Sequence, residues 1–229
     1  MKELGTVTLF GVDCVDINRL ITASEICQRE MKFGDVKLLS SIPSNNPSVF
    51  PIPAITSIKD YSSFMIRNAG DYVKTEFALV IQYDGFIVNP AAWNDQFLRY
   101  DYIGAPWWAD EKFLVGQGGF SLRSQRLMKI LQQIDTSDLG EIPEDWYIAV
   151  TKRSELEAKG MRFAPADLAR QFSFEGNEKE GIEWNGQFGF HGLKWTDISK
   201  WLQKNPEYPI ENKFDDWALG MKAKLNIQH

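Results

Sequence analysis

The stretch "TVTLFGVDCVDINRLITASEICQREMKFGDVKLLSS", Thr6 to Ser41, decides the fold class of this chain. Its beginning, Thr6 to Asp13, is rich in β-branched and apolar residues and contains one glycine, which is typical of a buried strand. Apolar residues then recur at helical spacing from Ile17 to Ile26, and Asp16 is placed to cap that helix. The segment "VKLLSS" predicts a second strand. A strand, a helix and a strand in this order favour a parallel sheet with crossover connections, the α/β class.

A second unit of the same kind follows. The stretch "SIPSNNPSVFPIP", Ser41 to Pro53, is rich in Pro, Ser and Asn and predicts an irregular loop. Next, "SIKDYSSFMIRNAGDYV" predicts a helix with one apolar side, and the strand "FALVIQ" comes after it. The residues expected on that apolar side are Ile58, Tyr61, Met65 and Ala69. Since a single core can still grow at 229 residues, we expect one α/β domain with a mostly parallel central sheet flanked by helices.

Further helices are predicted in the second half. The segment "SQRLMKILQQI" repeats apolar residues at helical spacing, and the loop "GQGGFS" lies immediately before it. The segment "PEDWYIAVTKRSELEAKG" has Pro and acids at its head and Gly160 at its end, as helix starts and stops require. After His191 the sequence predicts one short helix, "DISKWLQK", and a polar tail.

Composition and charge exclude several classes of protein. The net charge of −6 argues against nucleic acid as a partner, because neutralising a phosphate backbone needs a basic face. The two cysteines, Cys14 and Cys27, are not spaced for a disulfide framework or a zinc site. No window approaches the roughly 20 apolar residues of a membrane span, and the start lacks a signal-peptide core. We therefore expect a cytoplasmic protein.

The stretch "LVIQYDGFIVNP", Leu79 to Pro90, interrupts a strand-like run with Asp84 and Gly85. An Asp-Gly pair between β-prone runs is most often a tight turn. The alternative is a functional carboxylate, because ligands of open α/β sheets bind at the carboxyl ends of the strands. An acid at that place could hold a divalent metal and a substrate phosphate.

Three other segments could carry chemistry. In "VGQGGFSLRS", Val115 to Ser124, the glycine pair lets backbone approach a ligand or makes a tight turn, and Arg123 could reach a phosphate or be solvated. This loop is neither a P-loop nor a dinucleotide fingerprint. The pair Glu144-Asp145 either stabilises a helix start or supplies a general base. Apart from His229, His191 is the single histidine, and it is either structural or a ligand.

In their order along the chain, these four sites resemble the landmarks of GT-A-fold nucleotide-sugar glycosyltransferases. The blocks "QYDGFIVNPAAWNDQFLRYDYIGAPWW", "VGQGGFSLRS", "EDWY", "RFAPADLARQFSFE" and "FGFHG" resemble a bacterial family of uncharacterised glycosyltransferases related to that fold. The resemblance extends from about Phe77 to Gly192. It implies one GT-A-like domain, with a nucleotide-binding half (1–82), a metal and acceptor half (83–195) and a C-terminal helix and tail (196–229).

The resemblance also implies roles for individual residues. GT-A enzymes hold a divalent metal on an Asp-x-Asp motif, and the corresponding triplet here is Gln82-Tyr83-Asp84. Asp84 is therefore the candidate ligand of Mg²⁺ or Mn²⁺, although the missing first acid leaves metal dependence open. His191 matches the late histidine that completes the metal shell or contacts the diphosphate. Asp145 matches the catalytic base, with Glu144 beside it.

By position, the fold places the nucleotide at "FGVDCVD" and the sugar and acceptor at the glycine loop, where Trp107 and Trp108 could cover a sugar face. The expected donor-binding residues are Gly11, Val12, Asp13, Gln82, Tyr83, Asp84, Gly118, Gly119, Phe120 and Arg123.

The implied activity is transfer of a sugar from a nucleotide-sugar donor to a hydroxyl acceptor, with inversion if Asp145 is a direct base. The implied acceptor is a glycan or a lipid-linked saccharide of bacterial surface glycan synthesis, met by peripheral contact with the inner membrane. Two alternatives stay open. A glycoside hydrolase would also use paired acids, and a catalytically inactive saccharide-binding relative would explain the missing first acid of the triplet.

Overall fold

The computed structural model describes residues 1–107, 115–177 and 181–211. Its centre is a six-stranded sheet in the order β3-β2-β1-β4-β6-β5. The strands are β1 (Lys2–Val12), β2 (Met31–Ser40), β3 (Val49–Pro51), β4 (Phe77–Ile81), β5 (Tyr102–Gly104) and β6 (Ser121–Ser124). The first four strands pair in parallel, whereas β6 runs antiparallel to both β4 and β5.

The expected mostly parallel sheet is therefore corrected to a mixed one. A parallel pair needs a crossover, usually through a helix, but antiparallel strands can be joined by a returning loop. The described part of the connection between β5 and β6 contains no helix, and β6 returns alongside β5. Strand β6 also lies between the glycine loop and the next helix, which were expected to adjoin directly.

Helix α1 (Ile17–Gln28) makes the crossover between β1 and β2, as predicted. The Asp16 side chain accepts a hydrogen bond from the amide of Asn18 and caps the helix start. Leu20 is fully buried against β1, where a Cβ at Gly11 would lie 2.8 Å from Leu20 Cδ1. Gly11 therefore allows α1 to pack closely on the sheet.

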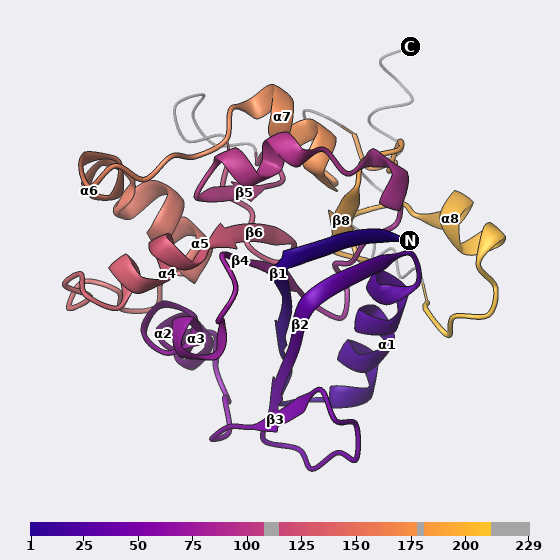
Figure 1. Ribbon diagram of the computed structural model, residues 1–229, viewed down its shortest axis with the longest axis horizontal. Coiled ribbons are helices and arrows are strands. Elements are labelled where there is room, and N and C mark those ends of the chain that lie inside the picture. Colours follow the sequence, from indigo (N-terminus) through magenta and orange to yellow (C-terminus); the bar gives the residue numbers. More distant parts are fainter. Residues whose placement is uncertain (108–114, 178–180, 212–229) are drawn as a thin grey trace.

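The other face of the sheet is covered by α2 (Ile58–Arg67), α3 (Ala69–Tyr72) and α4 (Gln125–Leu131). Figure 1 shows α1 on one side of β1 and β2, and α2 with α3 on the other. Met65 and Ala69 are buried there, as expected, but Ile58 is 69% exposed because it is the first residue of α2. The predicted loop Ser41 to Pro53 also contains a short strand, β3, which pairs with the end of β2.

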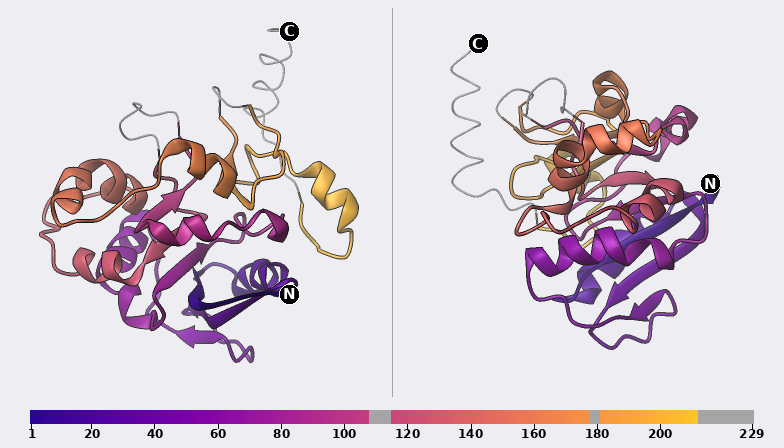
Figure 2. Two further views of the ribbon diagram at one scale, coloured as in Figure 1. Left: turned by 45° about the horizontal axis from the view of Figure 1, so that its top comes forward. Right: turned by 90° about the vertical axis from the view of Figure 1, so that its left-hand side faces the viewer.

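The later chain adds α5 (Glu144–Trp146), a π-helical turn (Tyr147–Thr151), α6 (Arg153–Ala158), α7 (Ala166–Phe172) and α8 (Ser199–Lys204). Two 3-10 helices, Pro90–Ala92 and Asp95–Arg99, precede β5. Figures 1 and 2 place α7 at the end of the molecule away from β3. A second, parallel sheet consists of β7 (Ser173–Glu175) and β8 (Gly189–His191). None of the described helices is long and apolar enough to cross a membrane.

Candidate active site

The strand order of the main sheet reverses between β1 and β4, since β2 lies on one side of β1 and β4 on the other. In open α/β sheets, ligands bind at the carboxyl ends of the strands at this kind of switch point. Strand β1 ends at Val12 and β4 ends at Ile81. The residues that follow, Asp13 and the triplet Gln82-Tyr83-Asp84, therefore lie at the expected place for a ligand.

Asp84 is part of a tight turn, and one oxygen of its partly buried carboxylate is fully buried. Gln82 and Gly85 exchange two backbone hydrogen bonds of 3.1 Å each, which closes the turn around Tyr83 and Asp84. The carbonyl of Asp84 accepts a hydrogen bond of 2.7 Å from the amide of Gly192. Its Oδ1 atom is buried and has no hydrogen-bond partner among the described residues. Because buried polar atoms are rarely left unpaired, this oxygen is open to a partner from outside the described chain, such as water or a bound ligand.

His191 faces that oxygen, with its Nε2 atom 3.7 Å from Asp84 Oδ1. The pairing of β7 with β8 sets Glu175 opposite His191, and Glu175 Oε2 lies 2.9 Å from His191 Nδ1. Gln82 Oε1 lies 3.1 Å from Nε2. Burial alone would lower the pKa of His191, but the charges of Glu175, Asp84 and Asp145 outweigh it and raise the pKa to about 9. The histidine is thus held in place from both ring nitrogens.

The glycine pair packs between this histidine and the acidic pair. A Cβ at Gly119 would lie 2.0 Å from His191 Nε2, so the ring rests directly on the backbone. The amide of Gly118 donates a hydrogen bond of 3.0 Å to Asp145 Oδ2. The glycine pair therefore lets the loop backbone pack closely against His191 on one side and against Asp145 on the other.

Asp145 is partly exposed and has a strongly shifted pKa. Burial and the neighbouring charge of Glu144 raise the pKa to about 7, although the amides of Trp146 and Gly118 donate to the carboxylate. A carboxylate that titrates near neutral pH is suited to accept a proton from a substrate. This is the property that a general base needs.

Arg123 and Glu144 form a buried ion pair. Arg123 Nη2 lies 2.8 Å from Glu144 Oε1, and their side chains are 1% and 7% exposed. Arg123 also donates to the Gly118 carbonyl and to Ser121 Oγ. Arg123 is therefore not solvated, which was one of the two expectations, and its predicted contact with a donor phosphate stays a prediction. Glu144 thus holds Arg123, and Arg123 in turn holds the loop through the Gly118 carbonyl.

The residues at the end of β1 also have structural partners. The Asp13 carboxylate accepts hydrogen bonds from the amides of Val15 and Asp16 and a bidentate pair from Arg19. The Val12 side chain is buried in the core and Gly11 carries none, so donor binding at these positions would use the backbone and stays a prediction.

Phe120 is fully buried in an aromatic cluster with Phe172 and Phe188. Packing of the core accounts for the position of this ring, and a contact of Phe120 with the sugar stays a prediction.

Two hollows open around these groups. The first, of about 350 Å³, lies between α1 and the segments after β4 and β8. Its lining residues are Arg19, Thr22, Tyr83, Asp84, Leu193, Lys194, Pro209, Ile210 and Glu211. The Arg19 guanidinium lies 3.7 Å from the centre of the Tyr83 ring. This hollow therefore adjoins Asp84 and combines cationic, aromatic and acidic groups.

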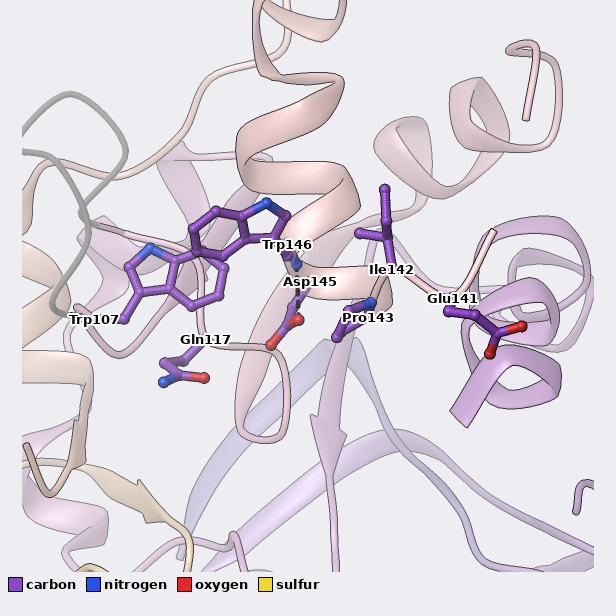
Figure 3. A pocket seen from close by; sticks show the side chains of 7 residues that line it. All are labelled: Trp107, Gln117, Glu141, Ile142, Pro143, Asp145 and Trp146. Atoms are coloured by element: carbon purple, nitrogen blue, oxygen red, sulfur yellow. Dashed lines mark hydrogen bonds between the residues drawn. The ribbon is translucent and has the colours of Figure 1, made fainter. Parts of the chain in front are cut away.

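The second hollow, of about 700 Å³, adjoins Asp145. Figure 3 shows its lining residues Trp107, Gln117, Glu141, Ile142, Pro143, Asp145 and Trp146. The ring centres of Trp107 and Trp146 are 5.3 Å apart. Trp108, which was also expected near a sugar, lies outside the described residues.

Sequence reasoning missed Glu175, Arg19 and Trp146. Glu175 ends the β-prone run "SFE" just before a glycine, the same signal that singled out Asp84. Trp146 directly follows the candidate base. Arg19 gave no such signal, because a single arginine in the first turns of a helix is ordinary.

Metal binding can be tested against the donor atoms. The described residues contain no group of three or more His, Cys, Asp or Glu side chains able to hold a metal ion. Asp84 Oδ1 supplies one donor atom. His191 Nε2 would supply a second once the ring loses the proton that its raised pKa retains at neutral pH. Glu175 on Nδ1 matches the carboxylate that commonly orients a ligating histidine. Asp84 and His191 would suit Mg²⁺ or Mn²⁺ only if water and substrate phosphates filled the remaining coordination positions.

Comparisons with known proteins give a family and two structural neighbours. A family model described as "Protein of unknown function (DUF5672)" matches residues 46–191. No curated protein matches the chain. A crystal structure of a glycosyltransferase involved in the glycosylation of the major capsid of PBCV-1 is similar, with a TM-score of 0.48 and 11% identity over 88% of this chain and 98% of that one. The structure of A197 from STIV has a TM-score of 0.41 and 13% identity over 72% and 83% of the two chains.

Proposed function

The chain belongs to the DUF5672 family of proteins of unknown function, and we propose that it is a glycosyltransferase that uses a nucleotide-diphosphate-sugar donor. The observation that carries the proposal is the buried Asp84 oxygen, which has no hydrogen-bond partner among the described residues and faces His191 at the switch point of the sheet. The order of motifs that resembles GT-A enzymes supports the same assignment.

In this proposal the diphosphate of the donor binds beside Asp84. Asp84 and His191 would hold Mg²⁺ or Mn²⁺, which, when bound, stabilises the negative charge of the departing nucleoside diphosphate. Glu175 fixes the orientation of the histidine ring. Gln82, which stands where the first acid of the motif is expected, bonds His191 on one side and Tyr61 on the other. Lys194 adds positive charge to the adjoining hollow, whereas the Arg19 guanidinium there is paired with Asp13.

Asp145 is the proposed base that takes the proton of the acceptor hydroxyl. Its pKa of about 7 leaves a large fraction deprotonated at neutral pH while the carboxylate remains basic enough to accept a proton. A base that acts directly on the acceptor corresponds to inversion at the sugar carbon. Glu144 is committed to Arg123, so the adjacent acids cannot act as the acid pair that a glycoside hydrolase requires.

The division into halves at residues 82 and 195, a surface-glycan acceptor and a cytoplasmic place at the inner membrane remain predictions. The proposal does not depend on them, because it concerns only the donor centre, which consists of Asp84, His191 and Glu175, and the base Asp145.

Thermal unfolding with nucleotides tests the donor centre, since a ligand that binds the folded state raises the Tm. We expect one nucleoside diphosphate to raise the Tm in the presence of Mn²⁺ and not without it. Asp84→Asn should remove that rise, whereas Asp167→Asn, a change at a fully solvated aspartate, should keep it. The proposal fails if no nucleotide or nucleotide sugar shifts the Tm, or if Asp84→Asn responds like the wild type.

A further inference from the structure

We propose that the hollow beside Asp145 binds an uncharged pyranose ring of the acceptor, stacked on Trp146. Its role as the acceptor site rests on the proposed function, but the binding of the sugar does not. The lining residues, seen in Figure 3, supply an aromatic wall, an aliphatic wall and a small number of polar groups. This is the usual composition of a pocket for a small organic ligand.

Trp146 is the first observation behind the proposal. Trp146 is 38% exposed, and few large apolar residues in the described parts of the chain are more exposed. Its ring lies against Trp107, and Figure 3 shows the two indoles together on one side of the hollow. A pyranose ring has an apolar face formed by its C–H groups, and a flat aromatic ring covers such a face while the hydroxyls stay free. The indole pair is therefore suited to a sugar ring.

The opposite wall and the floor fit the same ligand. Ile142 and Pro143 face the indoles across Asp145 in Figure 3, and the Gln117 amide lies below the rings. Hydrogen bonds from Gly118 and Trp146 fix the Asp145 carboxylate, so it can receive a hydroxyl of a ring that stacks on Trp146. The aromatic wall would fix the ring, and the carboxylate would select one hydroxyl.

The charges of the lining decide which sugars fit. Among the seven described lining residues, Asp145 and Glu141 are ionisable and none is Lys, Arg or His. Glu141 is paired with Lys59 at 3.1 Å, which leaves Asp145 as the unpaired charge of these seven. A carboxylated or phosphorylated ring would bring a like charge to Asp145, which is unfavourable at short distance. The proposed ligand is therefore a neutral pyranose rather than a uronic acid or a sugar phosphate.

The position of the hollow connects it to the donor centre. Gly118 bonds Asp145, and the next residue, Gly119, supports the His191 ring. A ring hydroxyl at Asp145 would thus lie across a two-residue stretch of backbone from the proposed diphosphate site. Transfer needs the donor and the acceptor in this kind of proximity.

Saturation-transfer NMR on the full chain, without nucleotide or metal, tests the binding. The probes are the methyl glycosides of glucose, galactose, mannose and N-acetylglucosamine, with methyl glucuronide as the anionic counterpart of methyl glucoside. We expect at least one neutral glycoside to bind, and the glucuronide to bind about tenfold more weakly. Trp146→Ala should weaken the neutral glycoside about tenfold, whereas Trp146→Phe, which keeps a flat ring, should retain most of the binding.

The inference is overturned if none of the neutral glycosides binds, if Trp146→Ala binds like the wild type, or if the glucuronide binds as well as the glucoside. The nucleotide experiment separates this failure from failure of the proposed function. Sugar binding without any nucleotide response would keep this inference and reject the transferase. A nucleotide response without sugar binding would reject this inference and keep the proposed transferase.

Discussion

Replacing Glu144 by alanine should strongly destabilise the protein, because it leaves the Arg123 guanidinium buried without its counter-ion. The two side chains are almost completely buried and 2.8 Å apart. The remaining acceptors of Arg123 are the Gly118 carbonyl and Ser121 Oγ, and the Tyr102 ring lies 5.3 Å from the guanidinium carbon. These neutral groups stabilise the charge only in part.

Breaking a buried ion pair by removing one partner costs about 3 to 5 kcal/mol. Since Arg123 keeps two neutral acceptors, we expect the lower end, about 3 kcal/mol of unfolding free energy. For a chain of this size each kcal/mol lowers the Tm by about 2 to 4 °C, so the expected loss is roughly 6 to 12 °C. Replacing both partners, as Arg123→Met with Glu144→Leu, removes both charges and should stay within about 1 kcal/mol of the wild type.

Urea and thermal unfolding followed by circular dichroism measure these differences. Glu3→Ala is the matched control, because Glu3 pairs with Lys32 at a similar distance, 3.2 Å, but on the surface. Surface pairs contribute about 0 to 1 kcal/mol, so this variant should resemble the wild type. The reasoning is refuted if Glu144→Ala is no more destabilising than Glu3→Ala, or if the double variant is as unstable as the single one.

Three further predictions concern the donor centre and the base. Gly119→Ala places a Cβ 2.0 Å from His191 Nε2 and should abolish Mn²⁺-dependent nucleotide binding in titration calorimetry. Gly5→Ala is the control, because its Cβ would meet no atom within 4 Å, and it should bind like the wild type. Equal binding by the two variants would contradict the packing of Gly119 on His191. Glu175→Gln should weaken Mn²⁺ binding about tenfold, measured by electron paramagnetic resonance, because the histidine loses its orienting carboxylate. Asp145 binds its proton more tightly in the folded than in the unfolded chain, so its contribution to stability falls as the pH rises from about 4 to about 7. Asp145→Asn should therefore raise the Tm relative to the wild type at pH 8 and not at pH 4, and a pH-independent difference would disprove the shift.

The sequence predicted the parts of the fold that depend on local pattern. The unit from β1 to β2 follows from one apolar run, one amphipathic helix and the cap at Asp16. The strand end at Asp84 was also visible, since an acid interrupts an apolar run. The antiparallel direction of β6 was not predicted, because the sequence of a four-residue strand does not indicate which strand it pairs with or in which direction.

The contacts within the site were less predictable for the same reason. Arg123 looks like a solvated cation in sequence, and only the approach of Glu144, 21 residues later, explains its burial. Glu175 and His191 lie on two strands of three residues each, too short for a periodic pattern to indicate that they pair. Residues whose roles depend on such distant partners cannot be assigned from spacing alone.

The pairing of β7 with β8 has a consequence for the order of assembly during synthesis. All six strands of the main sheet lie before residue 125, yet Gln82 meets its histidine partner 109 residues later in the chain. A nascent chain that has just completed β6 contains the whole main sheet but lacks both Glu175 and His191. The strands of the main sheet therefore leave the ribosome before the residues of the proposed donor centre are complete, and that centre can form only after β8 has emerged.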